Sequence, residues 1–516
     1  MTAGQVDKGG RLTADVVVVG GGGAGMAAAL RSRQLGLSVI LVEKAQQVGG
    51  TTGLSVGTIM AAGGHHQKSS QIHDTPERHA ADLAGIAQGM NLGDNPEIRK
   101  LLTENVADTV SFLEAAGVRF LAPLPQPPHK ADRLHQVMPT SRAYVYLLER
   151  ELRRLGVQIL TSAPMRRILS EGGRVVGVEV EMAGRRQAVL AVRGVVLASG
   201  DIGGDRQMMR THMKTAIDAA VPYNPANTGD GQRLAAEIGA KIASRPDMPA
   251  ELACHIRFPR PGPSWLHKIP PHPFVTRMMV NAYRVLPQAL IRPFLMGFLT
   301  TTLGPDRGVF EQGAIVVNQR GERFSDELKD LNYLLPDQPE GKGYIIFDEK
   351  FACKFSQWPH FISTAPGVAF AFLQDYRRGR PDLFFQEQSL AALADRIGAD
   401  RGALERSVDR ANADRAADKK IEQGPFYALG PLQLWVMVAQ VGLTVDSQLR
   451  VLDEGNQAIP GLYAAGGAGQ GGFTISGHGH GLGWAFTSGR LAAESVAKST
   501  SARQGAAASV NIPSIQ

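Results

Sequence analysis

Runs of apolar residues near the start of the chain alternate with segments rich in glycine and alanine. Four consecutive valines, Val16–Val19, are typical of a parallel strand that is buried on both faces. Several glycines follow, and the alanine-rich stretch that continues to Leu30 predicts a helix. A second apolar run, Ser38–Val42, predicts another buried strand. This order of strand, helix and strand predicts a parallel sheet of the α/β class.

The same patterning predicts elements further along the chain. Residues 75–117 have apolar positions at helical spacing and predict two surface helices. The apolar positions within 157–200 predict a β-meander that returns to a buried strand. A hairpin, a buried strand, a charged helical segment, a glycine-terminated strand and a closing helix are expected at 313–324, 343–348, 387–420, 459–467 and 485–496, respectively.

The glycines after the first strand have the G-x-G-x-x-G spacing of a dinucleotide-binding turn. Gly20 allows the tight turn, Gly22 lets a pyrophosphate approach the backbone, and Gly25 lets the helix touch the strand. Glu43 ends the second strand, at the position where a carboxylate can hold a ribose diol. A glycine-rich loop without a ligand is the alternative interpretation. The combination of strand, glycines, helix and terminal acid favours a dinucleotide site.

Composition and charge mainly exclude certain classes of partner, cofactor and targeting segment. The chain has 516 residues, enough for more than one domain, and its 43% hydrophobic and 20% charged residues are ordinary. Its net charge of +7 forms no basic stripe with interleaved aromatic residues, so we expect no nucleic acid partner. The two cysteines, Cys254 and Cys353, form no metal-ligand motif, which indicates a reducing compartment, no metal site and no covalent haem. The first ten residues are polar, so we expect no signal peptide.

Residues 274–303 differ in character from the rest of the chain. They are strongly apolar, but three arginines and two prolines interrupt them. The uninterrupted apolar part is too short to span a bilayer. It is suited to a membrane interface or to covering an apolar pocket, and a buried pair of helices in a capping domain explains the composition equally well.

Six motifs follow one another along the chain in the same order as in a known family of proteins. They are Gly20-x-Gly22-x-x-Gly25 with Glu43, Gly49-Gly50-Thr51, Ala198-Ser-Gly200, Asn227-Thr-Gly-Asp-Gly231, Gly321-Glu-Arg-Phe324 and Gly461-Leu-Tyr-Ala-Ala-Gly466. Over residues 14–498 the chain resembles the flavoproteins of the fumarate reductase, succinate dehydrogenase and 3-ketosteroid dehydrogenase superfamily. The resemblance implies an α/β fold with an α+β cap, in which a capping (substrate) domain is inserted into a Rossmann-like FAD-binding domain.

The resemblance also implies how the chain is divided and which residues hold the cofactor. The expected parts are a flexible N-terminus, the first part of the FAD-binding domain, the capping domain, the second part of the FAD-binding domain and a flexible tail, at 1–13, 14–219, 220–345, 346–498 and 499–516. FAD is expected to bind non-covalently. The residues expected to hold it are Gly20, Gly22, Gly23, Ala24, Gly25, Glu43, Lys44, Gly49, Gly50, Thr51, Thr52, Met165, Ser199, Gly200, Asp230, Gly467, Gly483, Trp484 and Ala485.

The substrate-binding pattern of the fumarate reductases is largely missing from this sequence. Their proton-donating arginine corresponds to Lys329, and their late histidine falls in the apolar run Leu434–Ala439. A later arginine of that branch is replaced within residues 474–479. A dicarboxylate would lose its charged partners here, at a cost of several kcal/mol. We therefore expect a largely uncharged, lipophilic substrate.

The ketosteroid dehydrogenase branch fits better. It implies hydride transfer from Cβ to flavin N5, removal of the α-proton by a base, and an enolate oxygen held by backbone N–H groups. The turn at Gly479 matches that branch, but Ile475 stands where it has its tyrosine. The base is therefore left among His478, His480, Tyr333 and Tyr144. Each candidate has a structural alternative, since the histidines can shape the turn, Tyr144 can be packing and Lys329 can be a surface ion.

The expected function is FAD-dependent α,β-dehydrogenation of a lipophilic ketone, cyclic or steroid-like, as in steroid metabolism. The electron acceptor is a quinone, a carrier or oxygen. The alternative is a fumarate reductase-like enzyme that reduces an activated C=C bond, with Lys329 as the acid. A third hypothesis is a flavin carrier bound to a membrane periphery through residues 274–303. We expect a cytoplasmic location, with any membrane association made through the same segment.

Overall fold

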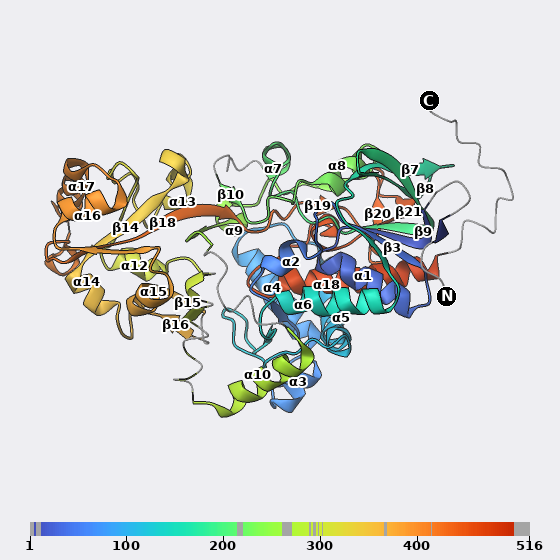
Figure 1. Cartoon of the computed structure of the whole chain (residues 1–516), viewed down its shortest axis with the longest axis horizontal. Helices are drawn as coiled ribbons and strands as arrows, with labels where there is room; N and C mark the ends of the chain where they lie inside the picture. Colours follow the sequence, from blue (N-terminus) through green and yellow to red (C-terminus); the bar gives the residue numbers. More distant parts are fainter. Residues whose placement is uncertain are drawn as a thin grey trace.

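The protein forms two lobes along its long axis (Figure 1). The computed structural model describes residues 5–6, 12–213, 220–260, 271–287, 290, 292, 296–297, 299–301, 303–365, 369–413 and 415–499. The first lobe, at the right of Figure 1, contains the larger sheet, and the second lobe, at the left, contains a smaller one. The long strand β18 (Phe426–Val436) reaches from the second lobe toward the first.

The larger sheet has the predicted strand–helix–strand order at its centre. β2 (Leu12–Val19) pairs in parallel with β3 (Val39–Val42), and α1 (Gly23–Gln34) connects the two. The sheet follows the order β20-β21-β9-β2-β3-β6, with β8 attached to β9, β7 to β8 and β1 to β2. The bounds of these strands are β1 Gln5–Val6, β6 Gln158–Leu160, β7 Met165–Glu171, β8 Arg174–Met182, β9 Arg185–Leu197, β20 Arg450–Leu452 and β21 Ala458–Ala464. Val16, Val17 and Val18 are completely buried, because helices cover this part of the sheet.

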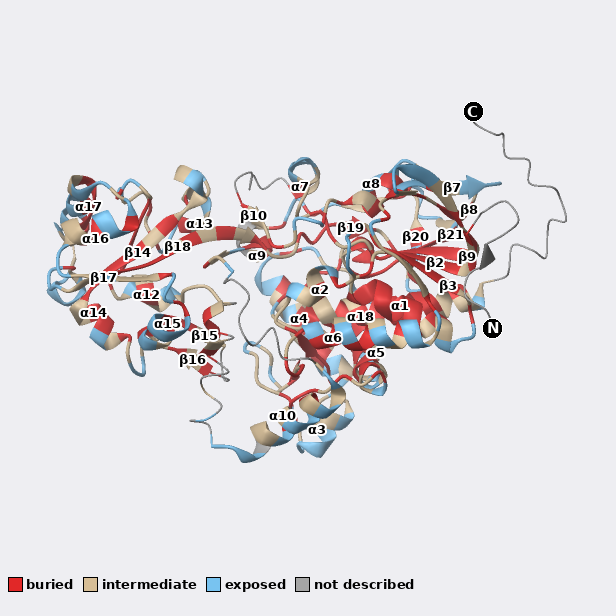
Figure 2. Ribbon diagram, viewed as in Figure 1, coloured by how far each residue is buried: buried red, intermediate tan, exposed pale blue. Residues whose placement is uncertain are grey.

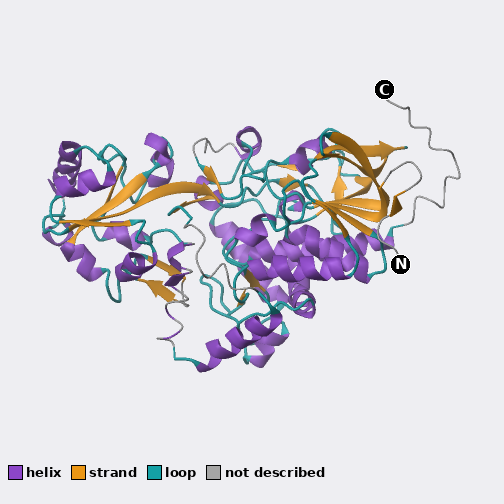
Figure 3. Ribbon diagram, viewed as in Figure 1, coloured by secondary structure: helices purple, strands orange, loops and turns teal. Residues whose placement is uncertain are grey.

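A helical layer covers one face of the larger sheet (Figure 3). It is built from α1, α5 (Pro96–Ala115), α6 (Arg142–Arg154) and α18 (His480–Lys498). A Cβ atom on Gly489 would lie 2.1 Å from the carbonyl oxygen of Ala24, so α18 can cross α1 this closely only with glycine there. Both helices are buried along much of their length (Figure 2). α18 begins at His480, five residues before the predicted start.

The smaller sheet is organised around β18. Its order is β10-β18-β14-β13, and β12 and β17 also pair with β18. The strands are β10 Val221–Pro222, β12 Cys254–Arg257, β13 Ile315–Val317, β14 Gly343–Asp348 and β17 Phe384–Glu387. Ile345 and Phe347 enter one apolar core and Ile346 enters another, as the period of two in a strand requires. Because β18 pairs with β14 and β17, the chain rejoins the larger sheet only at β20.

Shorter elements complete both lobes. The three two-stranded sheets pair β4 (Thr58–Met60) with β5 (Leu134–Gln136), β11 (Ile242–Ala243) with β19 (Gly442–Leu443), and β15 (Ser363–Ala365) with β16 (Ala369–Ala371). The other helices are α2 Gly50–Leu54, α3 His65–Ser69, α4 Pro76–Gly89, α7 Arg206–Met213, α8 Asp230–Ala236, α9 Ala250–Ala253, α10 Pro273–Val285, α12 Arg307–Glu311, α13 Leu331–Leu334, α14 Glu349–Lys354, α15 Leu373–Gly379, α16 Leu390–Ile397 and α17 Arg401–Ala413. Within the described ranges, every helix is too short or too polar to cross a bilayer.

Candidate active site

A cavity of about 820 Å³ lies between the two lobes. The first lobe lines it with the carboxyl ends of β2 and β3 and the beginning of α1, and the second lobe with β12 and with residues 327–332. Met437 and Val438, which directly follow β18, complete the wall between the lobes. The carboxyl edge of a parallel sheet is where α/β proteins bind their ligands, so this cavity is the candidate active site.

The glycine turn has the close contacts that its spacing predicted. Gly20 has a φ of 110°, and a Cβ there would lie 2.3 Å from the carbonyl oxygen of Ala198. A Cβ on Gly25 would lie 1.8 Å from the carbonyl oxygen of Gly20, so helix and turn touch. No atom lies within 4 Å of a Cβ built on Gly22, which faces the cavity. Two of these glycines are therefore required by packing, and the third leaves room for a ligand.

Glu43 holds the turn in place. Its carboxylate accepts hydrogen bonds from the backbone N–H of Gly21 at 2.6 Å and of Ala45 at 2.8 Å. Lys44, the next residue, forms an ion pair with Asp230 at 2.7 Å and donates a hydrogen bond to Thr228 at 2.6 Å. These contacts tie the end of β3 to the start of α8 at the cavity wall.

The residues of the cavity fit a bound dinucleotide. The hydroxyl of Ser199 is buried at the wall and has no hydrogen-bond partner in the described part of the chain. A buried polar atom of this kind normally finds a partner, and a ligand in the cavity would supply one. A Cβ on Gly231 would lie 2.2 Å from this hydroxyl, so only glycine fits beside it at 231.

Most residues expected to hold the cofactor line this cavity. They are Gly20, Gly22, Gly23, Ala24, Glu43, Lys44, Gly50, Thr51, Thr52, Met165, Ser199, Gly200, Asp230, Gly467, Trp484 and Ala485. Gly25, Gly49 and Gly483 do not line it and support it from behind. The N–H of Gly49 donates to the carbonyl oxygen of Gly21, and Gly483 faces Val106 of α5.

Gly467 has no room for a side chain. A Cβ at this position would lie 2.9 Å from the backbone nitrogen of Asp201 and 3.0 Å from the carbonyl carbon of Gly200. The two glycine-terminated strands of the larger sheet approach each other too closely here for a side chain. The cofactor contact expected of this position is therefore limited to backbone atoms.

Of the candidate catalytic residues, His478, Gly479 and Lys329 line the cavity. Gly479 has a φ of 93° and precedes the first residue of α18, and its carbonyl oxygen accepts a hydrogen bond from the backbone N–H of Met60. Burial, assisted by the charge of Arg257, lowers the pKa of His478 to about 4. His478 is therefore neutral at pH 7 and can accept a proton.

Lys329 occupies the rim of the cavity. Its side chain is 80% exposed and forms an ion pair with Asp326 at 2.7 Å. This hydrogen-bonded partner raises the pKa of Lys329, so the ammonium group keeps its proton. Lys329 can therefore act as an acid or as a surface ion, but it is unsuited to act as a base.

Two tyrosines, which the sequence suggested as the base, do not line the cavity and are rejected as candidates. Tyr144 is completely buried, its hydroxyl donates to the carbonyl oxygen of Gly57 at 2.8 Å, and burial raises its pKa well above the ordinary value. It packs against Phe486 in the core and does not line the cavity. Tyr333 lies on α13 with half of its side chain exposed, outside the cavity wall.

His480 is also rejected as the base, because both of its ring nitrogens have hydrogen-bond partners in the core. Nδ1 lies 2.6 Å from the carbonyl oxygen of Ser476, and Nε2 lies 2.9 Å from Nε2 of His79. A carbonyl accepts only, so the proton is on Nδ1, and Nε2 accepts from His79. Burial lowers the pKa of His480 well below its ordinary value, so the ring is neutral. His480 holds the turn and does not reach the cavity.

The sequence analysis missed His255 and Arg257 of β12, which line the cavity. Burial lowers the pKa of His255 to about 4, and the nearby Arg257 and His478 contribute. His255 is exposed, because it borders the cavity. Two polar residues two positions apart in a short strand share one face, and this pattern was the available signal.

Comparison with known proteins agrees with the fold and the cofactor site. The model of the FAD binding domain family matches residues 15–256 and 280–483. NADH:fumarate oxidoreductase of Klebsiella pneumoniae (strain 342) is 26% identical over 474 residues, which are 88% of this chain and 44% of that protein. This chain therefore spans less than half the length of that relative. 4-Oxocyclohexanecarboxylate 2-dehydrogenase of Sinomonas cyclohexanicum is 24% identical over 596 residues, 94% of this chain and 93% of that protein.

Two solved structures share the architecture. The open conformation of a flavocytochrome c3 fumarate reductase has a TM-score of 0.71 at 22% identity, over 94% of this chain and 78% of that one. The 3-ketosteroid delta1-dehydrogenase of Sterolibacterium denitrificans has a TM-score of 0.65 at 22% identity, over 94% and 99%. Fold and site are thus those of a flavoprotein, and the proteins similar to it include fumarate reductases and 3-ketosteroid dehydrogenases. The chain belongs to the FAD binding domain family, and its cofactor is FAD.

Proposed function

We propose that this protein is an FAD-dependent oxidoreductase that acts on a CH–CH bond next to a carbonyl group, in the direction of dehydrogenation. One observation carries the proposal: His478, a neutral histidine with a pKa of about 4, lines the cavity directly before the start of α18. At pH 7 a neutral imidazole has a nitrogen lone pair free to accept a proton, and it lacks the second proton that an imidazolium acid would donate.

Each part of the cavity has a role in this reaction. Bound FAD supplies the acceptor for two electrons. The beginning of α18, where Gly481 and Leu482 line the cavity, presents backbone N–H groups and the positive end of the helix dipole to a carbonyl oxygen. These groups stabilise the negative charge that develops on that oxygen when the α-proton leaves. The Nε2 or Nδ1 atom of His478 receives this proton.

The second lobe provides the substrate end of the cavity. Its lining is mainly apolar and includes Leu252, Ile256, Phe310, Leu331, Met437 and Val438. These side chains favour a lipophilic substrate, such as a cyclic or steroid-like ketone. The charged residues of this lining are Arg257, Arg307, Glu327 and Lys329. 4-Oxocyclohexanecarboxylate, named in one relative, is a ring ketone with a carboxylate. We propose that Arg257 binds a polar group at the far end of the ring.

A reductase that adds hydrogen to an activated C=C bond is the second candidate. Lys329 at the rim supports it, because Asp326 keeps the ammonium group protonated and able to donate. Relatives named as fumarate reductases favour it as well. In this reaction His478 would have to be protonated beforehand, which its low pKa opposes at neutral pH.

An anaerobic flavin absorbance titration tests the two directions. Cyclohexanone, 4-oxocyclohexanecarboxylate and a saturated 3-ketosteroid are added to the oxidised protein, and fumarate to the dithionite-reduced protein. We expect at least one ketone to bleach the flavin. Recovery of the oxidised spectrum with fumarate, and no bleaching by any ketone, would establish the reductase instead. The electron acceptor is then sought among quinones, carriers and oxygen by following reoxidation of ketone-reduced protein.

We also propose that α10 and the residues after it contact a membrane surface, from which a lipophilic substrate or quinone can be drawn. Phe274, Met278, Val285 and Leu290 expose 70%, 57%, 82% and 66% of their surface. Residues 252–305 contain six arginines and lysines and no acidic residue. An exposed apolar helix face in a basic segment suits the interface of an anionic bilayer.

A further inference from the structure

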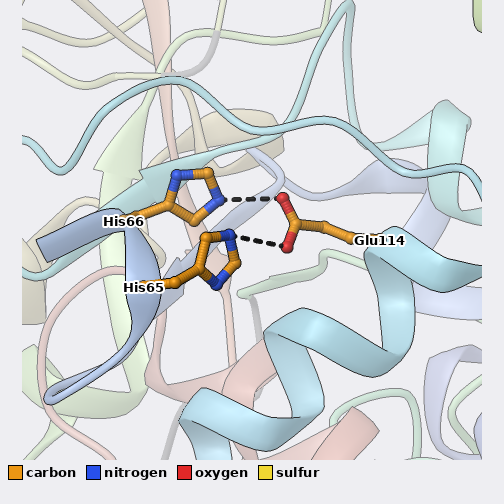
Figure 4. A group of neighbouring side chains, drawn as sticks. All are labelled: His65, His66 and Glu114. Carbon is orange, nitrogen blue, oxygen red and sulfur yellow. Dashed lines mark hydrogen bonds and ion pairs between the residues drawn. The ribbon is translucent and has the colours of Figure 1, made fainter. Parts of the chain in front are cut away.

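Two adjacent histidines and one glutamate converge at a place outside the flavin cavity (Figure 4). His65 and His66 open α3, and Glu114 belongs to the last turn of α5. Nε2 of His65 lies 3.1 Å from one carboxylate oxygen of Glu114, and Nε2 of His66 lies 2.9 Å from the other. One ligand atom from each of the three residues can be chosen so that all lie within 4.8 Å of one another.

A buried anchor holds this arrangement. Gln67, the residue after the two histidines, is 1% exposed, and its side-chain oxygen accepts a hydrogen bond from the N–H of Gly63 at 2.6 Å. Its amide group donates to Asp74 at 3.0 Å and to the carbonyl oxygen of Asp132 at 2.9 Å. These hydrogen bonds fix α3 to the residues before and after it. The fold therefore holds the two imidazoles over α5, in addition to their contacts with Glu114.

The donor set selects a class of ion. Two imidazole nitrogens and one carboxylate oxygen suit divalent transition metals such as Zn²⁺ and Co²⁺, whereas Mg²⁺ and Ca²⁺ prefer oxygen ligands alone. Ligand atoms placed 2.0–2.1 Å from a tetrahedral zinc ion are about 3.3 Å apart. The two histidine–glutamate separations of 3.1 and 2.9 Å are close to this value. We propose that His65, His66 and Glu114 bind one divalent transition-metal ion, with water in the remaining position.

Binding requires a change of protonation in the site. In the structure each Nε2 atom that meets Glu114 donates its hydrogen to the carboxylate. A metal ion takes the place of these hydrogens, so each imidazole must carry its proton on Nδ1 instead. Both rings must also be neutral, because only an unprotonated imidazole nitrogen can bind a metal ion.

The ion would stabilise the support of the active site without taking part in its chemistry. It would join α3 to α5, and α3 follows β4 after four residues. Met60 of β4 donates its backbone N–H to the carbonyl oxygen of Gly479, at the cavity wall. We therefore expect bound metal to raise the unfolding temperature and to leave the flavin absorbance spectrum unchanged.

Titration of the FAD-loaded protein with Co²⁺ tests the site, after dialysis against a chelator. The expected result is one equivalent bound, seen as cobalt absorbance bands that Zn²⁺ abolishes and that millimolar Mg²⁺ and Ca²⁺ leave intact. His66→Ala and Glu114→Gln should each weaken binding roughly tenfold or more, since each removes one of three ligands. The matched control is Glu104→Gln, an exposed acid of the same helix outside the cluster.

Two outcomes overturn the proposal. One is the lack of any saturable binding of Co²⁺ or Zn²⁺ at one equivalent. The other is unchanged affinity in the double variant His65→Ala/His66→Ala, which would place the ion elsewhere. An unaltered flavin spectrum and circular dichroism spectrum in each variant show that it is folded, so that loss of binding is not loss of structure.

Discussion

His478 is the candidate base that both lines the cavity and has a lowered pKa. It lines the cavity one residue before Gly479, which directly precedes α18. Burial and the neighbouring Arg257 keep the ring neutral. Tyr144, Tyr333 and His480, by contrast, are a core side chain, a surface side chain and a support of the turn. The proton acceptor can therefore be tested at a single position.

Replacing His478 separates the two directions of the reaction. His478→Gln keeps a polar side chain of similar size but cannot accept a proton, so ketone-dependent flavin reduction should slow about 10²- to 10⁴-fold. Stopped-flow absorbance measures this rate, and the flavin content of the purified variant shows whether the cofactor site is intact. Lys329→Gln is the matched variant at the rim and should leave ketone oxidation within a few-fold of the starting rate. The reverse pattern would identify Lys329 as the acid of a reductase.

The pH dependence of kcat/KM provides a second test at the same residue. The pKa of His478 is lowered, so its neutral form, the active base, predominates above about pH 4 and is lost below it. Activity should therefore rise through pH 4 and stay level to pH 7. Arg257→Gln removes one cause of the lowered pKa, and the acid limb should move toward the ordinary value of about 6.5. An acid limb at the same pH in both proteins would show that another group titrates.

The sequence predicts the chemistry of this turn but not the direction of each side chain. His478 and His480 are two residues apart in a glycine-rich stretch, and they were equivalent candidates. In the structure the helix begins between them, so His478 faces the cavity while His480 is the first helical residue and enters the core against His79. His255 and Arg257 were missed because their strand pairs with β18, about 180 residues later in the chain.

At the scale of elements, the predictions were best where local sequence decides the structure. β2, α1 and β3 are confirmed, because the valine run, the glycine turn and the alanine helix each favour one conformation. The start of α18 was placed too late, because glycines at 481 and 483 have low helix propensity. Tertiary packing overrides that propensity: Gly483 lies against Val106 of α5. The role of β18 depends on partners far away in sequence, which no local pattern reveals.

The exposed face of α10 leads to a prediction for one element. Phe274→Ser with Met278→Ser removes two exposed apolar side chains, each worth about 2 kcal/mol when buried in an apolar phase. Flotation with phosphatidylserine-containing vesicles should recover the unmodified protein and lose most of this variant. Trp358→Ser, an equally exposed apolar residue of the second lobe, is the control and should float normally.

Vesicles of different charge then separate the contribution of the apolar side chains to membrane binding from that of the basic residues. Neutral phosphatidylcholine vesicles should bind less protein than anionic ones, because the basic residues of 252–305 have no partner there. Equal flotation of the double serine variant and the unmodified protein would exclude α10 as the contact. Failure of the unmodified protein to float with either vesicle would exclude membrane contact under these conditions altogether.

At the scale of the whole molecule, function arises where the two lobes meet. The first lobe contributes the cofactor turn at the edge of its parallel sheet, and the second contributes the apolar wall and Arg257. The sequence predicts the first contribution, because its motif is contiguous. It predicts the second poorly, since the wall is assembled from β12, residues 327–332 and the end of β18. Motif reading therefore locates the cofactor and leaves the substrate to the structure.

Several histidines of the fold have lowered pKa values, which makes a prediction about acid stability. Burial is the main cause of the lowered pKa in His79, His135 and His480, which are buried, and in His129 and His478, which are half-buried. Unfolding exposes these rings, which then bind protons below about pH 6.5. The free energy of unfolding should therefore fall between pH 6.5 and 4, by about 1.4 kcal/mol per pH unit for each histidine.

The carboxylates with lowered pKa values contribute in a lower pH window, whereas Asp201, whose pKa burial raises, is the exception and contributes in the opposite sense. The pKa values of Asp74, Asp82 and Asp230 are lowered from an ordinary 3.8, so their stabilising contribution is complete above that pH and is lost only below it. Denaturant unfolding at pH 7.5, 6.0 and 5.0 and constant ionic strength should show uptake of several protons on unfolding. His478→Gln should remove about one proton from that uptake. A free energy of unfolding that is unchanged between pH 6.5 and 5.0 would mean that these histidines are protonated, or solvated, in the folded protein.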